Sequence, residues 1–266
     1  RPLDLPAPSQ FRTGAGRPGP GYWQQRVNYT IRATLDPETQ TLRGQERIHY
    51  VNRSPDALPY LWMHVEQNIC ASGSVTDKLD QPPLVFLGSA FDFSCKGFPG
   101  GLTLDSISSL GRPLDHAIDG TVMRVDLPQP LAPGAVMDLE IVWRFQVPPY
   151  GAGRMGHDGD LYELGQWYPR MAVYDDVKGW NHEPYLGGGE FYLEYGAFDV
   201  AITVPASYIV AATGVLQNPL QVLTTRQRAR LGRARTADSA IAIITREEAG
   251  DPARTRPVRT GTLTWR

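Results

Sequence analysis

The stretch 180–192, WNHEPYLGGGEFY, comes nearest to a metal site by residue type and spacing. A zinc peptidase helix carries H-E-x-x-H, which puts two imidazoles one turn apart on one face, with the glutamate beside them as general base. His182 and Glu183 fill the first two places, but Leu186 stands where the second imidazole belongs. Pro184 would also break the helix that this spacing requires. We therefore expect no metal ligands here.

Other candidate sites are weaker. The acidic stretch GHDGDLYE (156–163) lacks the spacing of a calcium loop and predicts a polar surface loop. The glycines at 187–189 lack the lysine and helix of a phosphate cradle and indicate a flexible joint. G-x-S-x-G does not occur, and His49 and His64 fit strand positions better than ligand positions. We expect no catalytic residue and no metal site in this chain.

The most unusual composition lies at 161–195, where nine aromatic residues are interleaved with carboxylates. Rings with polar tips beside acids suit a recognition surface or the wall of a cleft. A sandwich core with aromatic turns would also produce this composition. Pro169 and Pro184 favour loops over strand interiors, and loops more often carry function.

Composition limits the classes of function. The chain has 266 residues and a net charge of −2, which argues against a general attraction to nucleic acid or anionic membranes. No apolar run is long enough for a transmembrane segment. The start without Met indicates processing or engineering. Five arginines near the C-terminus predict a solvated helix face: Arg226, Arg228, Arg230, Arg233 and Arg235.

The elements that must position any site are mainly strands. Apolar residues alternate with polar ones over 27–35, the turn DPETQ follows, and a second alternating run covers 42–50. These two runs predict a hairpin. YLWMHV (60–65) is apolar on both faces and predicts a central strand.

Further strands are predicted along the rest of the chain, with one helix at 224–235. Pro- and Gly-rich turns at intervals of ten to twenty residues indicate an all-β domain, either a β-sandwich or a large curved antiparallel sheet. The last run stops in mid-strand, so we expect an artificial boundary or a continuing polypeptide. The predicted strands lie at 102–110, 121–128, 136–147, 191–205 (one or two), 208–214, 240–245 and 261–266.

Cys70 and Cys95 are the two cysteines of the chain. Spacing alone leaves two interpretations open, a free buried pair or a disulfide. A disulfide would stabilise the fold by about 3 kcal/mol. It would also favour an exported protein, periplasmic or extracellular.

The order of several sequence blocks resembles the N-terminal domain of aminopeptidase N-like zinc metallopeptidases, in particular a bacterial branch. The blocks are LGQWYPRMAVYDD, KGW, PYLGGGEFYLEYGAFDVAITVP and AATGVL, preceded by the hairpin from YWQQ to LWMHV and followed by RQRARLGRAR, AIAIITREEAG and GTLTWR. The resemblance implies a loose leader at 1–20 and a saddle-shaped all-β domain at 21–266. It also implies a separate C-terminal catalytic domain, absent from this chain, that holds zinc with H-E-x-x-H and a third glutamate.

The resemblance further implies a role at the substrate's amino end. In relatives, a T-Q-x-E-like segment helps to hold the ammonium group of a peptide, because amide and carboxylate oxygens accept its hydrogen bonds. Gln166 matches the glutamine, but Tyr168 stands in place of the glutamate. Glu163, Asp175 or Asp176 would have to compensate. Trp167 and Tyr168 would line the first side-chain pocket and favour apolar residues.

The resemblance thus predicts a noncatalytic front domain whose partners are its own catalytic domain and a peptide substrate. A scaffold with the family architecture but no peptidase activity is the alternative. A carbohydrate-binding sandwich that uses the aromatic residues of 161–195 is a third hypothesis.

Overall fold

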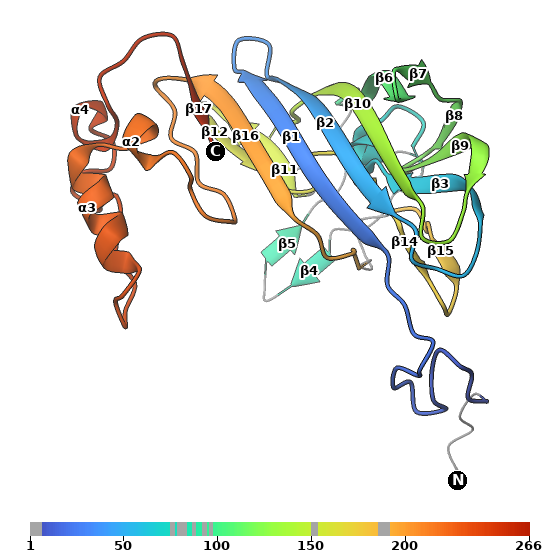
Figure 1. Ribbon diagram of the computed structural model, residues 1–266. Coiled ribbons are helices and arrows are strands. Elements are labelled where there is room, and N and C mark those ends of the chain that lie inside the picture. The colour runs from blue at the N-terminus through green and yellow to red at the C-terminus, as the bar shows by residue number, and fades with distance from the viewer. Residues whose placement is uncertain are drawn as a thin grey trace.

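Strands dominate the computed structural model, in which two sheets pack around one core and the longest helix stands apart from both (Figure 1). The structure describes residues 7–74, 78, 84–86, 89–91, 95, 98–149, 154–185 and 192–266. The predicted glycine joint at 187–189 lies outside the described residues, as do Leu186 and part of the GEFY block. The all-β fold class is confirmed.

The larger sheet has seven strands in the order β17-β16-β1-β2-β10-β6-β7. Its pairs are antiparallel except β1 and β16, which are parallel and connected by a long excursion through the second sheet. The predicted hairpin is therefore confirmed as β1 and β2. The strands are β1 (Arg26–Asp36), β2 (Thr41–Val51), β6 (Thr103–Ser109), β7 (Arg112–Pro113), β10 (Val136–Gln146), β16 (Phe198–Pro205) and β17 (Thr262–Trp265).

The second sheet has the order β13-β3-β9-β8, so that the predicted strand at 60–65 is central, as expected. Its strands are β3 (Leu58–His64), β8 (His116–Asp119), β9 (Val122–Leu131) and β13 (Arg170–Met171). Three small hairpins complete the strands of the described ranges: β4 (Leu84–Phe86) with β5 (Ser89–Phe91), β11 (Met155–Asp158) with β12 (Leu161–Leu164), and β14 (Val173–Asp175) with β15 (Gly179–Asn181).

One hydrophobic core joins the two sheets. The alternating residues of β1 and β10 face it, and Ile31, Ile141 and Trp143 are fully buried. Trp143 lies across the backbone of β2 at Gly44, where a methyl group would come within 2.1 Å of the indole ring. Glycine is required at this position because the ring takes the space of a side chain.

Helices are short except for α3 (Thr225–Ala234), which agrees with the predicted helix. A reciprocal cap of Thr224 and Gln227 starts it. The arginines of this helix are more than a solvated face, because Arg226 and Arg230 both pair with the buried Glu248. The other helices of the described residues are η1 (Glu66–Cys70), α2 (Pro219–Val222) and α4 (Pro252–Thr255). Among the described residues, no helix has the length and apolar character needed to cross a membrane.

Three local predictions were wrong. Residues 208–214 and 240–245 form no strand; the first segment packs against the edge of the larger sheet, and the carbonyl of Ile243 accepts a bond from Arg230. The acidic stretch 156–163 forms the β11–β12 hairpin instead of an irregular loop, with Gly159 in the left-handed conformation at its turn.

The described part of the N-terminal leader contacts the domain through Arg12. Its guanidinium binds both carboxylate oxygens of Asp176, at 2.6 and 2.8 Å, and lies over the ring of Tyr22. Asp176 is almost completely enclosed by this contact. A bidentate pair of this kind holds the leader in a defined place.

Cys70 and Cys95 form a disulfide. This decides between the two interpretations of the cysteine pair. The bridge joins the end of η1 to a segment 25 positions further along the chain.

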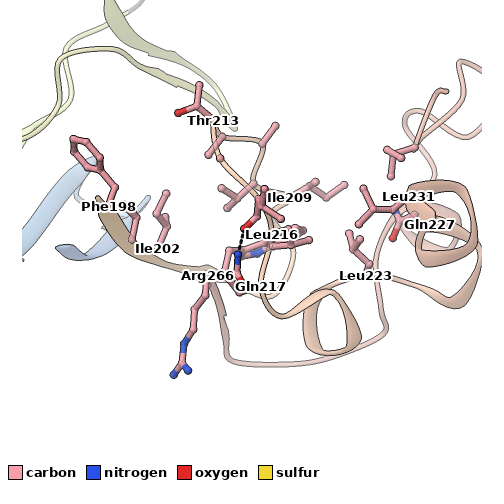
Figure 2. Close-up of a pocket in the computed structure, with 18 of the residues that line it drawn as sticks. Phe198, Ile202, Ile209, Thr213, Leu216, Gln217, Leu223, Gln227, Leu231 and Arg266 are labelled. Carbon is pink, nitrogen blue, oxygen red and sulfur yellow. Dashed lines mark hydrogen bonds between the residues drawn. The ribbon is translucent and has the colours of Figure 1, made fainter. Parts of the chain in front are cut away.

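An apolar cavity of about 890 Å³ lies between β16, the segment 209–217 and α3. Figure 2 shows Phe198 and Ile202 on the sheet side, Ile209 and Leu216 in the middle and Leu231 on the helix side. The cavity continues the inner face of the larger sheet past its edge.

Candidate functional site

The three predicted substrate-binding residues, Gln166, Trp167 and Tyr168, lie on the loop that connects β12 to β13. β13 pairs with β3, so the loop is attached to the central strand of the second sheet. Met171, directly after Arg170, donates its backbone N–H to the hydroxyl of Tyr29 on β1 at 3.0 Å. The loop therefore bridges the two sheets.

Gln166 has a left-handed backbone conformation, with φ of 54°. This conformation is costly for a residue other than glycine and is found where the surroundings enforce it. Its carbonyl oxygen accepts a hydrogen bond from the side-chain amide of Gln67. Within the described residues its own side-chain amide makes no hydrogen bond, and the residue is partly exposed. The amide is free to accept or donate to a ligand.

Trp167 and Tyr168 are partly buried against the core. Trp167 lies 6.1 Å from Trp143 between ring centroids, and Tyr168 lies edge-on to Tyr29 at 5.7 Å. Burial raises the pKa of Tyr168 to about 12, so that its hydroxyl stays protonated at neutral pH. The rings give the loop a fixed apolar base, and their exposed parts remain for contact.

Phe198 connects this loop to the apolar cavity. Its ring stacks on Tyr29 at 4.8 Å and meets Tyr168 edge-on at 6.3 Å. It also lines the cavity, and half of its surface is exposed. The loop and the cavity thus share one exposed aromatic residue.

The carboxylates expected to compensate for Tyr168 have other partners. Asp175 accepts from the backbone N–H groups of Val177 and Lys178, and Asp176 binds Arg12. Glu163 lies exposed on the β11–β12 hairpin. No hydrogen bond joins any of the three to Gln166 among the described residues.

Two other glutamates, which no sequence motif marks, affect the pKa of Tyr168. The charges of Glu46 and Glu66 both raise the pKa of its hydroxyl. Glu46 is buried, and among the described residues neither of its oxygens has a hydrogen-bond partner. Burial raises the pKa of Glu46 well above its usual range. Its place on the apolar face of β2 was visible in the alternation, but its chemical state was not.

Residues 182–185 form no helix, and their polar groups contact neighbours. His182 stacks on Trp62 at 4.5 Å and donates from Nδ1 to the carbonyl of Trp180, while Glu183 pairs with Lys178 at 3.0 Å. Across the described ranges, no three His, Cys, Asp or Glu side chains come together in a way that would hold a metal ion. These residues do not fit a catalytic zinc.

No protein-family model matches the chain, and no curated protein is similar to it in sequence. Solved structures similar to it include M1 zinc metallopeptidases from Deinococcus radiodurans. One of them has a TM-score of 0.42 and 16% identity over 75% of this chain and 37% of that chain. A mutant bound to a Tyr-Ser-Ala substrate has a TM-score of 0.41 and 16% identity over 73% and 36%. The chain spans just over a third of the length of these proteins.

Proposed function

We propose that this chain is the noncatalytic N-terminal domain of a zinc-dependent aminopeptidase, and that it helps to hold the amino end of a peptide substrate. Gln166 accepts from the ammonium group, and Trp167 and Tyr168 line the pocket for the first side chain. Its partners are a peptide and its own C-terminal catalytic domain. Apolar first residues are favoured because both rings are aromatic.

The observation that carries the proposal is the state of Gln166. Its backbone is held in a costly conformation by a buried partner, while its side-chain amide has no hydrogen bond within the described residues. Strained positions of this kind occur at ligand-binding sites, where a rigid shell fixes a polar group for its ligand. The same glutamine is the residue that the resemblance to the T-Q-x-E-like segment assigns to the amine.

Zinc and hydrolysis belong, in this proposal, to a catalytic domain outside this chain. When bound there, zinc would activate a water molecule for attack on the first peptide carbonyl. The described residues of this chain contribute recognition alone.

The disulfide supports a further part of the proposal, that the protein is exported to the periplasm or beyond. Disulfides persist in oxidising compartments and are rare in the cytosol. Cys70 and Cys95 are bonded to each other, and no free cysteine is found in the described residues.

The test begins with the gene. H-E-x-x-H within one or two hundred codons after residue 266 is expected, and the encoded longer polypeptide should release the first residue from an aminoacyl reporter when zinc is added. Gln166→Gly should raise KM in that enzyme and leave the fold intact. Absence of the motif, or release of amino acids by residues 1–266 alone after addition of zinc, contradicts the proposal.

A scaffold or interaction module is the second candidate, and the apolar cavity favours it. Exposed apolar side chains border the cavity at Phe198, Ile209 and Val215. Such a border suits contact with another polypeptide. The downstream sequence discriminates between the two candidates, since a scaffold needs no zinc motif.

A further inference from the structure

The short helix η1 is unusual because all five of its residues are buried, although three have polar or charged side chains. Such side chains are seldom fully buried unless they have specific partners. η1 follows β3 directly and lies against the loop that carries Gln166. Its sequence, EQNIC, assigns a different contact to nearly every residue.

Two adjacent residues of η1 form hydrogen bonds to the two ends of the candidate site. Gln67 donates from Nε2 to the carbonyl oxygen of Gln166, and Glu66 accepts from the guanidinium of Arg170. Gln166 and Arg170 are four positions apart, with Trp167 and Tyr168 between them. The contacts therefore hold the stretch before and after the two aromatic residues.

η1 is itself fixed on its other side. The Asn68 amide donates to the carbonyl of Gly120 at 2.9 Å and its oxygen accepts from the N–H of Leu102 at 2.7 Å. Cys70 closes the helix with the disulfide to Cys95. Contacts to three separate segments make η1 a rigid base for the loop.

We propose that Gln67 and Glu66 are positioning residues that hold the loop 166–170 in place, with Gln166 in its left-handed conformation. The purpose of that loop, to receive the amino end of a peptide, rests on the proposed function above. The buried Oε1 of Gln67 has no hydrogen-bond partner among the described residues, and burying such an oxygen costs free energy. The hydrogen bond that its NH₂ group donates to Gln166 offsets part of this cost. Without this bond, the unfavourable φ of Gln166 has less to enforce it.

The test uses the full chain labelled with 5-fluorotryptophan, with the fluorine resonance of Trp167 assigned by Trp167→Phe. Gln67→Leu removes the amide, and Gln67→Met keeps the length of the side chain but has no donor. Gln227→Leu is the matched control, because Gln227 is a buried glutamine whose Nε2 donates to the carbonyl of Thr255 at 2.6 Å, in the α3 region.

Both Gln67 variants should shift or broaden the Trp167 resonance and speed amide hydrogen exchange at 166–168 by at least tenfold. Gln227→Leu should leave both signals at their wild-type values, even if its unfolding midpoint falls as far as those of the Gln67 variants. If Gln67→Leu does not fold, Gln67→Met alone decides. Wild-type Trp167 and exchange signals in a folded Gln67 variant overturn the proposal.

Peptide binding separates this inference from the proposed function. Loosening of the loop in the Gln67 variants, with no binding of alanyl-alanine by the wild type, supports the positioning role and contradicts the proposed function. Binding of alanyl-alanine by the wild type, together with an unchanged loop in both Gln67 variants, supports the proposed function and contradicts the positioning role.

Discussion

The side-chain amide of Gln67 donates to the carbonyl oxygen of Gln166, and 99 positions of sequence separate the two residues. The neighbouring bond between Glu66 and Arg170 spans 104 positions. Together they join the end of the central strand of one sheet to the loop on which the proposed site depends. The conformation of this loop is therefore a property of the tertiary structure and not of its local sequence.

Loss of one partner in the Glu66–Arg170 pair should be costly. Both side chains are buried, so Arg170→Met leaves an uncompensated carboxylate in the interior. We expect the free energy of unfolding to fall by about 3–5 kcal/mol in urea denaturation. Arg124→Met breaks the exposed Arg124–Asp126 pair and should cost less than about 1 kcal/mol. Equal losses in the two variants would show that the buried pair has no special weight.

Glu46 should make stability depend on pH. Its pKa is 4.5 when unperturbed and is raised in the folded state by burial, so the folded protein keeps a proton that the unfolded chain releases. Stability should therefore fall as pH rises above about 4.5, by about 1.4 kcal/mol per unit until the folded pKa is reached.

Glu46→Gln carries no such proton, so its stability relative to the wild type should increase as pH rises from about 4.5 to 7. Urea denaturation of both proteins across this range measures the difference. A difference that stays constant with pH would contradict a buried, protonated Glu46.

Gly44 should tolerate no side chain. A Cβ at this position would lie 2.1 Å from the ring of Trp143, which is fully buried and has no room to move. Gly44→Ala should lower the free energy of unfolding by roughly 1–3 kcal/mol. Gly232→Ala is the control, since nothing lies within 4 Å of its added methyl group in α3, and it should stabilise by about 0.5–1 kcal/mol. Thermal unfolding of the two variants should shift in opposite directions.

Period-two alternation predicted the strands well where a residue's burial and its strand pairing coincide. The apolar residues of β1 and β10 repeat every second position because both strands lie on one core. The same signal was wrong at 208–214 and 240–245, where apolar residues pack against a sheet edge or a helix without pairing. A hydrophobic pattern predicts which residues are buried. It does not predict whether another strand lies alongside to pair with their backbone, because that strand comes from elsewhere in the chain.

The positions of Gln166, Trp167 and Tyr168 on one loop followed from the sequence, but the support for that loop did not. In the sequence, EQN is a short polar run after YLWMHV, and in the structure Glu66 and Gln67 are buried. Only the fold brings them to Gln166 and Arg170. The nearby cysteine was the available signal. Cys70 lies two positions after Asn68, and a buried disulfide at Cys70 draws the polar residues before it into the interior.

Removal of the disulfide should test the base of the loop. Cys70→Ala combined with Cys95→Ala should lower the free energy of unfolding by about 3 kcal/mol. Because η1 ends at Cys70, loss of the bridge should speed amide exchange at 66–68 more than it speeds exchange in the strands of the larger sheet. Uniformly faster exchange throughout the chain would show that the bridge acts on global stability alone.

The most direct measurement of the central claim is a nuclear magnetic resonance titration of the labelled chain with alanyl-alanine and with its N-acetylated form. The free amine should shift the side-chain amide of Gln166 and the indole of Trp167, and the acetylated peptide should shift neither. Gln166→Gly, which keeps the left-handed backbone and loses the amide, should abolish the response. Equal shifts with both peptides, or none with either, would contradict a site for the amino end of a peptide at Gln166.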